Sequence, residues 1–330
     1  MDIGREYADE MLNEMVQWIE KALNQSNKKA ENKIRSYLAK HIELIEDLAE
    51  QVDDGKITER ECQQILISKL TTGKEWAKVR DDVAKDMSNA QEKAIQATAV
   101  LLTAVYLYNR NYSNHAIERT LKARKNKTVS LPRHKTHEPI TPVKLNHRKN
   151  ERWHRRKVES VVRQGMKKGH SVDKMAKNLQ HVTGMDKNVA IRTVRTSVTN
   201  AESMARMDSI YDAMEQSIKM QKQWDAVKDT RTRTSHRIVD GERVAPNEYF
   251  SNGLFRPGDP YGRPEEIYNC RCGLKQVAEG YEVLDEPKAP AGMGRMEWIG
   301  EKPIPRHYGE TKKQYEKRVA KEREKRENRN

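Results

Sequence analysis

Three residues in the last third of the sequence, His236, Cys270 and Cys272, have side chains that bind transition metals. If the two cysteines lie in a β-strand, their side chains project from one face, and His236 can reach them from a preceding hairpin. One imidazole and two thiolates suit zinc, and Asp229 or Asp240 could supply a fourth ligand. Alternatively, the cysteines are compact core residues and the histidine is a hydrogen-bonding strut. The C-x-C spacing favours this alternative, because most zinc knuckles have C-x2-C and a second pair.

The same region contains residue types that could catalyse a hydrolysis. Ser235, His236 and Asp240 have the types of a catalytic triad, but the sequence lacks a G-x-S-x-G turn, and neighbouring side chains on a strand point apart. A nuclease could use His236 as general acid or base, with Arg231 and Arg233 neutralising phosphate, but nothing in the sequence requires it. We therefore predict a non-enzyme without catalytic residues or cofactor. A nuclease or toxin-like enzyme that uses His236 and the nearby Asp and Arg residues is the alternative.

The elements that must position these residues are a long helix and a small sheet. Asp240-Gly241 lies between β-branched residues and predicts a type I′ hairpin turn, whose two central positions need positive φ. Glu265 and Glu266 follow Pro264 and are predicted as a loop or a helix start, not as an acid/base pair. The predicted elements are a helix over 187–218, a strand over 222–227, the hairpin over 237–244, a Gly- and Pro-rich loop over 253–264 and a closing strand over 269–275.

Residues 1–125 are predicted to form an all-α module. Helices are expected over 2–23, 34–52, 58–70 and 75–109. Thr58 and Glu61 form a capping box at the start of the third helix. The first helix carries an apolar stripe of Ile3, Tyr7, Met11, Met15, Trp18, Ile19 and Leu23. Either this stripe binds a protein partner, or the helices over 34–52 and 75–109 cover it within the chain.

Two segments of low apolar content flank a second predicted domain. Residues 126–150 contain three prolines, three histidines and many basic residues, which predicts a basic linker. Residues 151–280 are predicted to form the second domain, and residues 281–330 a low-complexity charged tail. The predicted fold class is α+β, in which an all-α N-terminal module precedes a helix-plus-small-antiparallel-sheet domain and the tail.

Composition argues against several classes of protein. Hydrophobic residues make up 35% and charged residues 34% of the 330 residues, so we expect small cores and much solvated helix or linker. The most apolar run, residues 94–108, is too short and too polar to cross a membrane. The chain opens without the pattern of a signal peptide, so we predict folding in a cytoplasm and no membrane partner. Three cysteines exclude a disulfide framework.

The excess positive charge is concentrated in two segments. Residues 111–170 contain 17 basic and 4 acidic residues, and residues 302–330 contain 11 and 5. Such segments favour non-specific binding of double-stranded DNA through phosphate neutralisation, although a solvated basic face is the simpler interpretation. The residues predicted to contact DNA are Lys122, Arg124, Lys125, Lys127, Arg148, Lys149, Arg152, Arg155, Arg156 and Lys157.

The most specific signal is an ordered motif between residues 195 and 272. It comprises Arg195, Thr196, Trp224, Asp229, Arg231, Thr232, His236, Asp240, Gly241, Pro257, Gly258, Asp259, Pro260, Asn269, Cys270, Arg271 and Cys272. In this order and spacing the motif resembles the signature of phage minor head proteins related to protein F of phage Mu, the MuF-like head morphogenesis family. The resemblance covers about residues 150–277. The helical first third resembles, less specifically, the region that precedes this domain in the family.

This resemblance implies a minor head (minor capsid) protein of the virion, located in the capsid interior, that acts in procapsid and head assembly at the portal vertex. It implies the portal protein and the inner capsid or scaffold as partners, while the basic segments would contact packaged DNA. The protein would be made in the cytoplasm of the host bacterium. No catalytic activity is implied for this domain, although some family members carry a fused enzymatic toxin domain. A host-side DNA-binding regulator is a third interpretation of the charge pattern.

Overall fold

The computed structural model describes residues 3–142, 147–284, 297–299 and 302–327. The chain forms two compact units, each built from segments that are distant in sequence. The helical unit comprises Gln17–Ile95 and Lys144–Ile191, and the mixed unit comprises Met1–Val16, Gln96–Val143 and Arg192–Asn330. Helices together with a small antiparallel sheet in the mixed unit confirm the α+β class.

Neither unit is a continuous stretch of chain. Residues 1–125 and residues 151–280, each expected to form one domain, contribute segments to both units. The long helices α1 (Ile3–Ala39) and α8 (Gln180–Glu215) likewise have residues in both, as does α4 (Lys74–Gln96) through its last residue.

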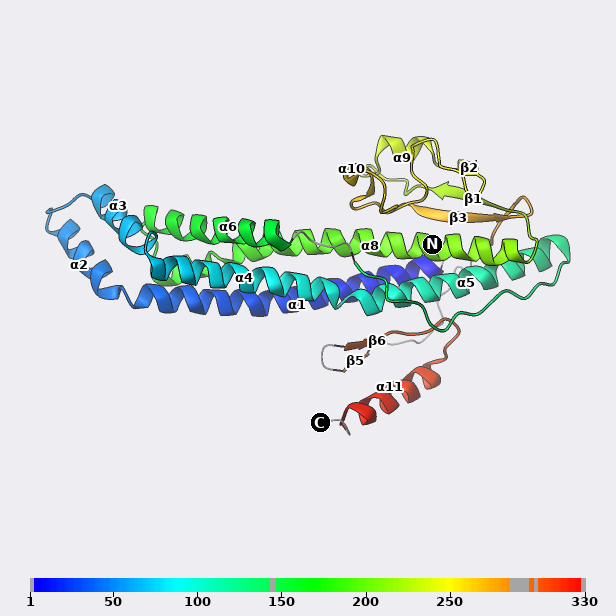
Figure 1. Cartoon of the computed structure of the whole chain (residues 1–330), viewed down its shortest axis with the longest axis horizontal. Coiled ribbons are helices and arrows are strands. Elements are labelled where there is room, and N and C mark those ends of the chain that lie inside the picture. Colours follow the sequence, from blue (N-terminus) through cyan, green and yellow to red (C-terminus); the bar gives the residue numbers. More distant parts are fainter. Residues whose placement is uncertain (1–2, 143–146, 285–296, 300–301, 328–330) are drawn as a thin grey trace. The chain divides into compact units, whose positions relative to one another are not determined.

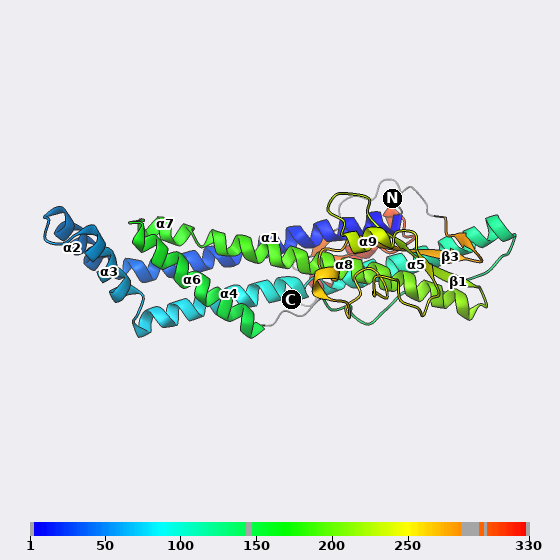
Figure 2. The same ribbon diagram turned by 90° about the horizontal axis from the view of Figure 1, so that it is seen from above.

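The helical unit is held by one apolar core under several helices, of which Figure 2 shows α2, α3, α4, α6 and α7. These are α2 (Ile42–Asp53), α3 (Glu59–Leu70), α4 (Lys74–Gln96), α6 (His147–Lys167) and α7 (Val172–Lys177). The predicted capping box of α3 is confirmed, since the Glu61 amide donates to Thr58 Oγ1 at 3.2 Å and the Thr58 amide donates to the Glu61 carboxylate at 2.8 Å. Ser171 caps α7 by a single hydrogen bond, because its Oγ accepts the Lys174 amide at 3.3 Å.

The helical region predicted over 75–109 is in fact two helices. The chain leaves the helical conformation after α4 and resumes it as α5 (Ala99–Lys125). The sequence between them contains neither Gly nor Pro, and the apolar period continues across the break, so local signals do not reveal it. No described helix is long and apolar enough to cross a membrane.

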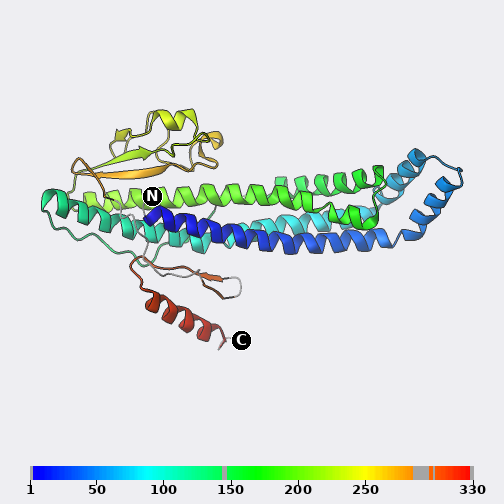
Figure 3. The ribbon, with the colours of Figure 1, turned by 180° about the vertical axis from the view of Figure 1, so that it is seen from behind.

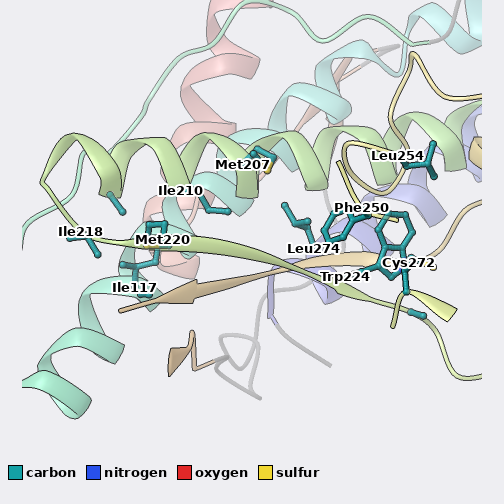
Figure 4. Packing of buried hydrophobic residues seen from close by; sticks show 14 of the residues in the cluster. Ile117, Met207, Ile210, Ile218, Met220, Trp224, Phe250, Leu254, Cys272 and Leu274 are labelled. Carbon is teal, nitrogen blue, oxygen red and sulfur yellow. The ribbon is translucent and has the colours of Figure 1, made fainter. Parts of the chain in front are cut away.

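The sheet of the mixed unit has the strand order β2-β1-β3-β4. Its strands are β1 (Met220–Asp225), β2 (Arg243–Val244), β3 (Gly273–Ala278) and β4 (Tyr281–Glu282). The two long strands, β1 and β3, are antiparallel from Met220 opposite Ala278 to Asp225 opposite Gly273. Figures 1 and 3 show β1 and β3 along α8. Figure 4 shows Trp224, Leu274, Met207 and Ile210 in the core between these strands and α8.

The predicted hairpin over 237–244 is wrong. Residues Thr234–Ile238 form a short helix, α9, and β2 pairs with β1 and not with the residues before the turn. Gly241 has the positive φ of +81° that the turn requires, but its amide donates to Trp224 O at 2.9 Å. The Asp-Gly signal thus located a turn correctly but not the strand partner, because β2 pairs with Lys222 and Gln223 of β1.

The apolar stripe of the first helix is core, so the expectation of an open partner surface is wrong. Ile3, Tyr7, Met11 and Met15 are all buried. The Tyr7 ring stacks on Tyr108 of α5, with 3.9 Å between centroids and 7° between planes. The stripe is therefore covered within the chain, which is the second of the two alternatives. Part of the cover is α5, which includes the end of the helix predicted over 75–109.

The described part of the predicted charged tail has regular structure. Strands β5 (Glu297–Ile299) and β6 (Lys302–Ile304) pair antiparallel, and α11 (Lys312–Glu327) follows. Ile304, Tyr315 and Val319 form a small core, and the Tyr315 hydroxyl donates to Ile304 O at 2.8 Å. Residues 285–296, also predicted as tail, lie outside the described residues.

Candidate functional site

The three predicted metal ligands converge in the core of the mixed unit. His236 lies on α9, and Cys270 and Cys272 lie between α10 (Pro264–Ile267) and β3. His236 Nδ1 is 3.6 Å from Cys270 Sγ and 3.4 Å from Cys272 Sγ. The relative exposures of the three residues are 1%, 1% and 3%. Among the described residues, these three are the one group of His, Cys or acidic side chains whose ligand atoms lie within 4.8 Å of one another.

The cysteines precede the closing strand and do not lie within it, contrary to expectation. Asn269, two residues after the end of α10, has a left-handed φ of +55°, so the backbone is not extended there. The Cys270 carbonyl accepts a hydrogen bond from Thr199 Oγ1 of α8 at 2.7 Å and not from a neighbouring strand. The strand therefore begins at Gly273, and the two thiols converge because of this turn and not because of strand alternation.

Glu266 on α10 completes the surroundings of His236. One of its carboxylate oxygens, Oε2, lies 3.1 Å from His236 Nε2 and accepts a hydrogen bond from Ser235 Oγ at 2.9 Å. A carboxylate at Nε2 favours the tautomer with its proton there, which turns the lone pair of Nδ1 toward the two sulfurs. Sequence reasoning missed this role of Glu266 and predicted only a helix start, which is confirmed by its place in the first turn of α10.

The two thiols have opposite pKa shifts. The hydrogen bond from Cys270 lowers the pKa of Cys272 to about 5, and the hydrogen bond with His236 acts in the same direction. The same hydrogen bond between the sulfurs, together with burial, raises the pKa of Cys270 well above its ordinary value. These shifts favour loss of the proton from Cys272 before Cys270. Such a pair can share a proton or bind a cation, but its burial keeps large substrates away.

Asp229 and Asp240 do not join this cluster, so neither supplies the expected fourth ligand. Asp229 forms a bidentate ion pair with Arg271, whose Nη1 and Nη2 donate to its carboxylate at 2.6 and 2.8 Å. This pair holds the pKa of Asp229 far below its usual range. The Asp240 carboxylate accepts the amide of Ala226 at 2.9 Å. Both acids fasten loops to the sheet.

Other residues of the ordered motif fasten the loop over 253–272 to α8. Thr196 Oγ1 accepts the Asn269 amide at 3.2 Å, and Arg195 Nη1 donates to the Asn269 side chain at 3.3 Å. Asp259 accepts two loop amides, those of Phe255 at 3.2 Å and Tyr261 at 3.0 Å. Gly258 has φ +70°, and a Cβ there would lie 2.9 Å from the backbone nitrogen of Asn200. The motif thus encodes a rigid loop on a helix.

The contacts of Ser235, His236 and Asp240 differ from those of a catalytic triad. Ser235 and His236 contact the same Glu266 oxygen and not each other, while Asp240 binds a backbone amide. Both nitrogens of His236 face protein partners, Glu266 on one side and the sulfurs on the other. Arg233 Nη2 donates to Tyr268 O at 2.5 Å. The geometry predicted for a nuclease, a histidine open to a phosphate, is not formed by these described residues.

The residues predicted to contact DNA are divided between the units. Lys122, Arg124 and Lys125 lie at the end of α5 and Lys127 lies two residues beyond it, all in the mixed unit. The other six lie on α6 in the helical unit. Lys122 and Arg124 are exposed, as are Arg152 and Arg156. Arg155 instead pairs with Asp81 at 2.9 Å. The side chains of Arg148 and Lys149 lie outside the described residues.

Comparisons with known proteins confirm the resemblance carried by the motif. The profile of a family described as "Phage Mu protein F like protein" matches residues 156–275. The chain is 29% identical over 126 residues to minor head protein GP7 of Bacillus phage SPP1, a match that covers 37% of this chain and 41% of that protein.

A second relative has an enzyme's name. The chain is 28% identical over 125 residues to NAD(+)--arginine ADP-ribosyltransferase EFV of Enterococcus faecalis (strain ATCC 700802 / V583). That match covers 37% of this chain and 26% of the transferase. The chain therefore spans less than half the length of either relative. No solved structure matches the chain.

Proposed function

We propose that this chain, whose residues 156–275 match the phage Mu protein F-like family, is a minor head protein that acts in head assembly at the portal vertex. Its partners are the portal protein and the inner capsid or scaffold, and its place is the interior of the virion. The observation that carries the proposal is the match of the complete motif region to this family, with a minor head protein among the relatives.

The contacts of the motif support a structural role. Its charged and polar residues bind backbone amides, carbonyls and one another, as Asp229 does with Arg271 and Thr196 with Asn269. Catalytic groups must reach a substrate, whereas the ring of His236 is enclosed by protein groups. A rigid, non-catalytic scaffold explains these contacts without further assumptions.

The basic segments are proposed to contact the packaged genome. Lys122 and Arg124 on α5, and Arg152 and Arg156 on α6, expose their charges. Residues of this kind neutralise phosphates and release counterions, which gives binding without sequence preference. The segment 111–170 has a net charge of +13, the largest concentration of charge in the sequence.

Co-expression with the portal protein of the same phage tests the proposed partner. We expect the full chain and the portal protein to co-purify as one complex through size-exclusion chromatography. Portal binding would be contradicted if the two proteins elute as separate peaks when both are more concentrated than in the infected cell. An unrelated phage portal serves as the control for non-specific association of a chain with net charge +14.

The enzymatic alternative is tested with the same purified chain. We expect no hydrolysis of DNA or RNA, with or without divalent metal, and no transfer of ADP-ribose from NAD⁺ to arginine. The non-enzymatic proposal would be overturned if the wild-type chain has one of these activities and a soluble, folded His236→Ala chain lacks it.

A further inference from the structure

We propose that His236 Nδ1, Cys270 Sγ and Cys272 Sγ bind a single zinc ion, and that Glu266 orients His236 for this purpose. The ion has a structural role: it connects α9 with the segment before β3. The proposal does not depend on the role of the chain in the phage head.

The two distances from His236 Nδ1 to the sulfurs are those of a tetrahedral site. With Zn–N of about 2.05 Å and Zn–S of about 2.3 Å, tetrahedral angles place a nitrogen and a sulfur ligand about 3.6 Å apart. The observed separations between His236 Nδ1 and the two sulfurs are 3.6 and 3.4 Å. One ion can therefore contact all three atoms with little movement of the chain.

The hydrogen bond to Glu266 gives His236 the tautomer that a metal ligand needs. Nε2 faces the Glu266 carboxylate at 3.1 Å, so Nδ1 presents its lone pair to the sulfurs. Zinc-binding histidines commonly donate their second ring N–H to a carboxylate, which fixes the ring and increases its basicity. Ser235 in turn donates to the same carboxylate at 2.9 Å and holds it in place.

Charge and burial favour zinc over an empty cluster. Two thiolates and one Zn²⁺ form a neutral group, which suits residues with exposures of 1% and 3%. The ring of Trp224 contacts His236 edge-on, with 5.1 Å between centroids, and shields the cluster from solvent. Nitrogen and sulfur ligands in this ratio also select zinc over magnesium or calcium, which prefer oxygen.

Three protein ligands leave one position for a water molecule. Asp229 and Asp240 are occupied with Arg271 and the Ala226 amide. The ion would join His236 to cysteines that lie 34 and 36 residues further along the chain, which stabilises a domain with a small core.

Elemental analysis of the full chain, purified under reducing conditions with zinc in the medium, tests the proposal. We expect about one zinc per chain, and the same content in Cys62→Ser, which removes the thiol outside the cluster. Cys270→Ser and Cys272→Ser should each lose the ion. A folded wild-type chain with no bound zinc, or with zinc that persists in both cluster variants, would overturn the proposal.

A second measurement keeps the test valid if the variants fail to fold. Zinc is removed from the wild-type chain with a chelator and replaced with Co²⁺. A tetrahedral site with two thiolates gives intense visible d–d bands and a sulfur charge-transfer band, whereas weak octahedral spectra would contradict the proposed ligands.

Glu266→Gln tests the orienting carboxylate, and it should weaken zinc binding about 10- to 100-fold in competition with a chromophoric chelator. Glu265→Gln is the matched control, because Glu265 lies beside it on α10 and pairs with Arg263 at 3.7 Å. Equal affinities of the two variants would contradict the role assigned to Glu266.

Discussion

At the scale of single residues, the ordered motif specifies contacts that fasten loops. Arg271 forms an ion pair with Asp229, and Thr199 donates a hydrogen bond to the Cys270 carbonyl. The Asp259 carboxylate accepts two amides of its own loop. These contacts are charge-assisted or buried, and such hydrogen bonds contribute more to stability than exposed neutral ones. Arg271, Thr199 and Asp259 therefore serve to hold the loop over 253–272 in place.

Two glycines of this loop have similar φ angles, but only Gly258 lies close to α8, so we expect alanine substitutions at the two positions to differ in their effect on stability. Gly253→Ala, at φ +78° and with no atom within 4 Å of the new Cβ, should cost only the backbone strain, roughly 1–2 kcal/mol. Gly258→Ala, at φ +70°, should cost about 1–3 kcal/mol more, because its Cβ would lie 2.9 Å from the Asn200 nitrogen. Urea denaturation measures both free energies of unfolding, and equal losses would contradict the close packing.

The ion pair of Asp229 predicts a pH dependence of stability. Arg271 lowers the pKa of Asp229 in the folded chain below the value of about 3.9 for an unfolded chain. The pair therefore stabilises the fold above about pH 4, and this contribution is lost as pH falls through the folded pKa. Asp229→Asn should lower the Tm at about pH 6 and lose this difference in more acidic solution.

Asp225→Asn is the control for this experiment. Its carboxylate lies 3.5 Å from Lys275 Nζ on the same sheet, and the substitution leaves the Asp229 pair intact. This control should keep the acid dependence of the wild type. A Tm difference between wild type and Asp229→Asn that does not change with pH would mean that the pair does not act through its charge.

At the scale of elements, local patterns predicted helices better than strands. Amphipathic spacing and capping residues are local, so helix was correctly assigned to most of the first third of the chain and the start of α3 was correctly placed. The helix boundaries were less accurate, because α1 continues through residues 24–33, where the sequence predicted a gap. The hairpin over 237–244 was wrong, because an Asp-Gly pair marks a turn but does not choose the partner strand. The role of Glu266 could not be predicted, since its contact with His236 spans 30 residues and depends on how α9 and α10 fold onto the sheet.

The basic ends of α5 and α6 predict the salt dependence of DNA binding by the full chain. Each phosphate contact contributes about 0.9 to the slope of log affinity against log salt. The double variants Lys122→Gln with Arg124→Gln and Arg152→Gln with Arg156→Gln should each reduce this slope by about 2. Fluorescence anisotropy with a labelled duplex measures the slope across several salt concentrations.

Lys28→Gln with Lys29→Gln is the matched control for charge. Both lysines are exposed on α1, outside the basic segment, and removing them changes the net charge by the same amount. This variant should keep the wild-type slope. If all three double variants reduce the slope equally, binding depends on net charge alone and the predicted contacts are wrong.

At the scale of the whole molecule, the sequence suggested consecutive domains, but each compact unit collects distant segments. The mixed unit joins the first residues of α1, all of α5 and the C-terminal elements, as the hydrogen bond of 2.8 Å from Tyr7 Oη to Arg306 O illustrates. Contacts over 299 residues leave no local trace in composition or periodicity.

Loss of the hydrogen bond between Tyr7 and Arg306 in Tyr7→Phe should cost about 1 kcal/mol in the free energy of unfolding, measured by urea denaturation.

Quantitative mass spectrometry of purified particles tests the central claim, that this chain is a minor head protein, most directly. The chain should be present in both DNA-filled virions and DNA-free procapsids, in a small and constant number of copies relative to the portal protein. Procapsids are essential to the design, because a chain that merely adheres to the genome would be found in filled particles alone. Absence from both kinds of particle, with the chain abundant in the infected cell, would contradict the claim and favour a host-side DNA-binding regulator.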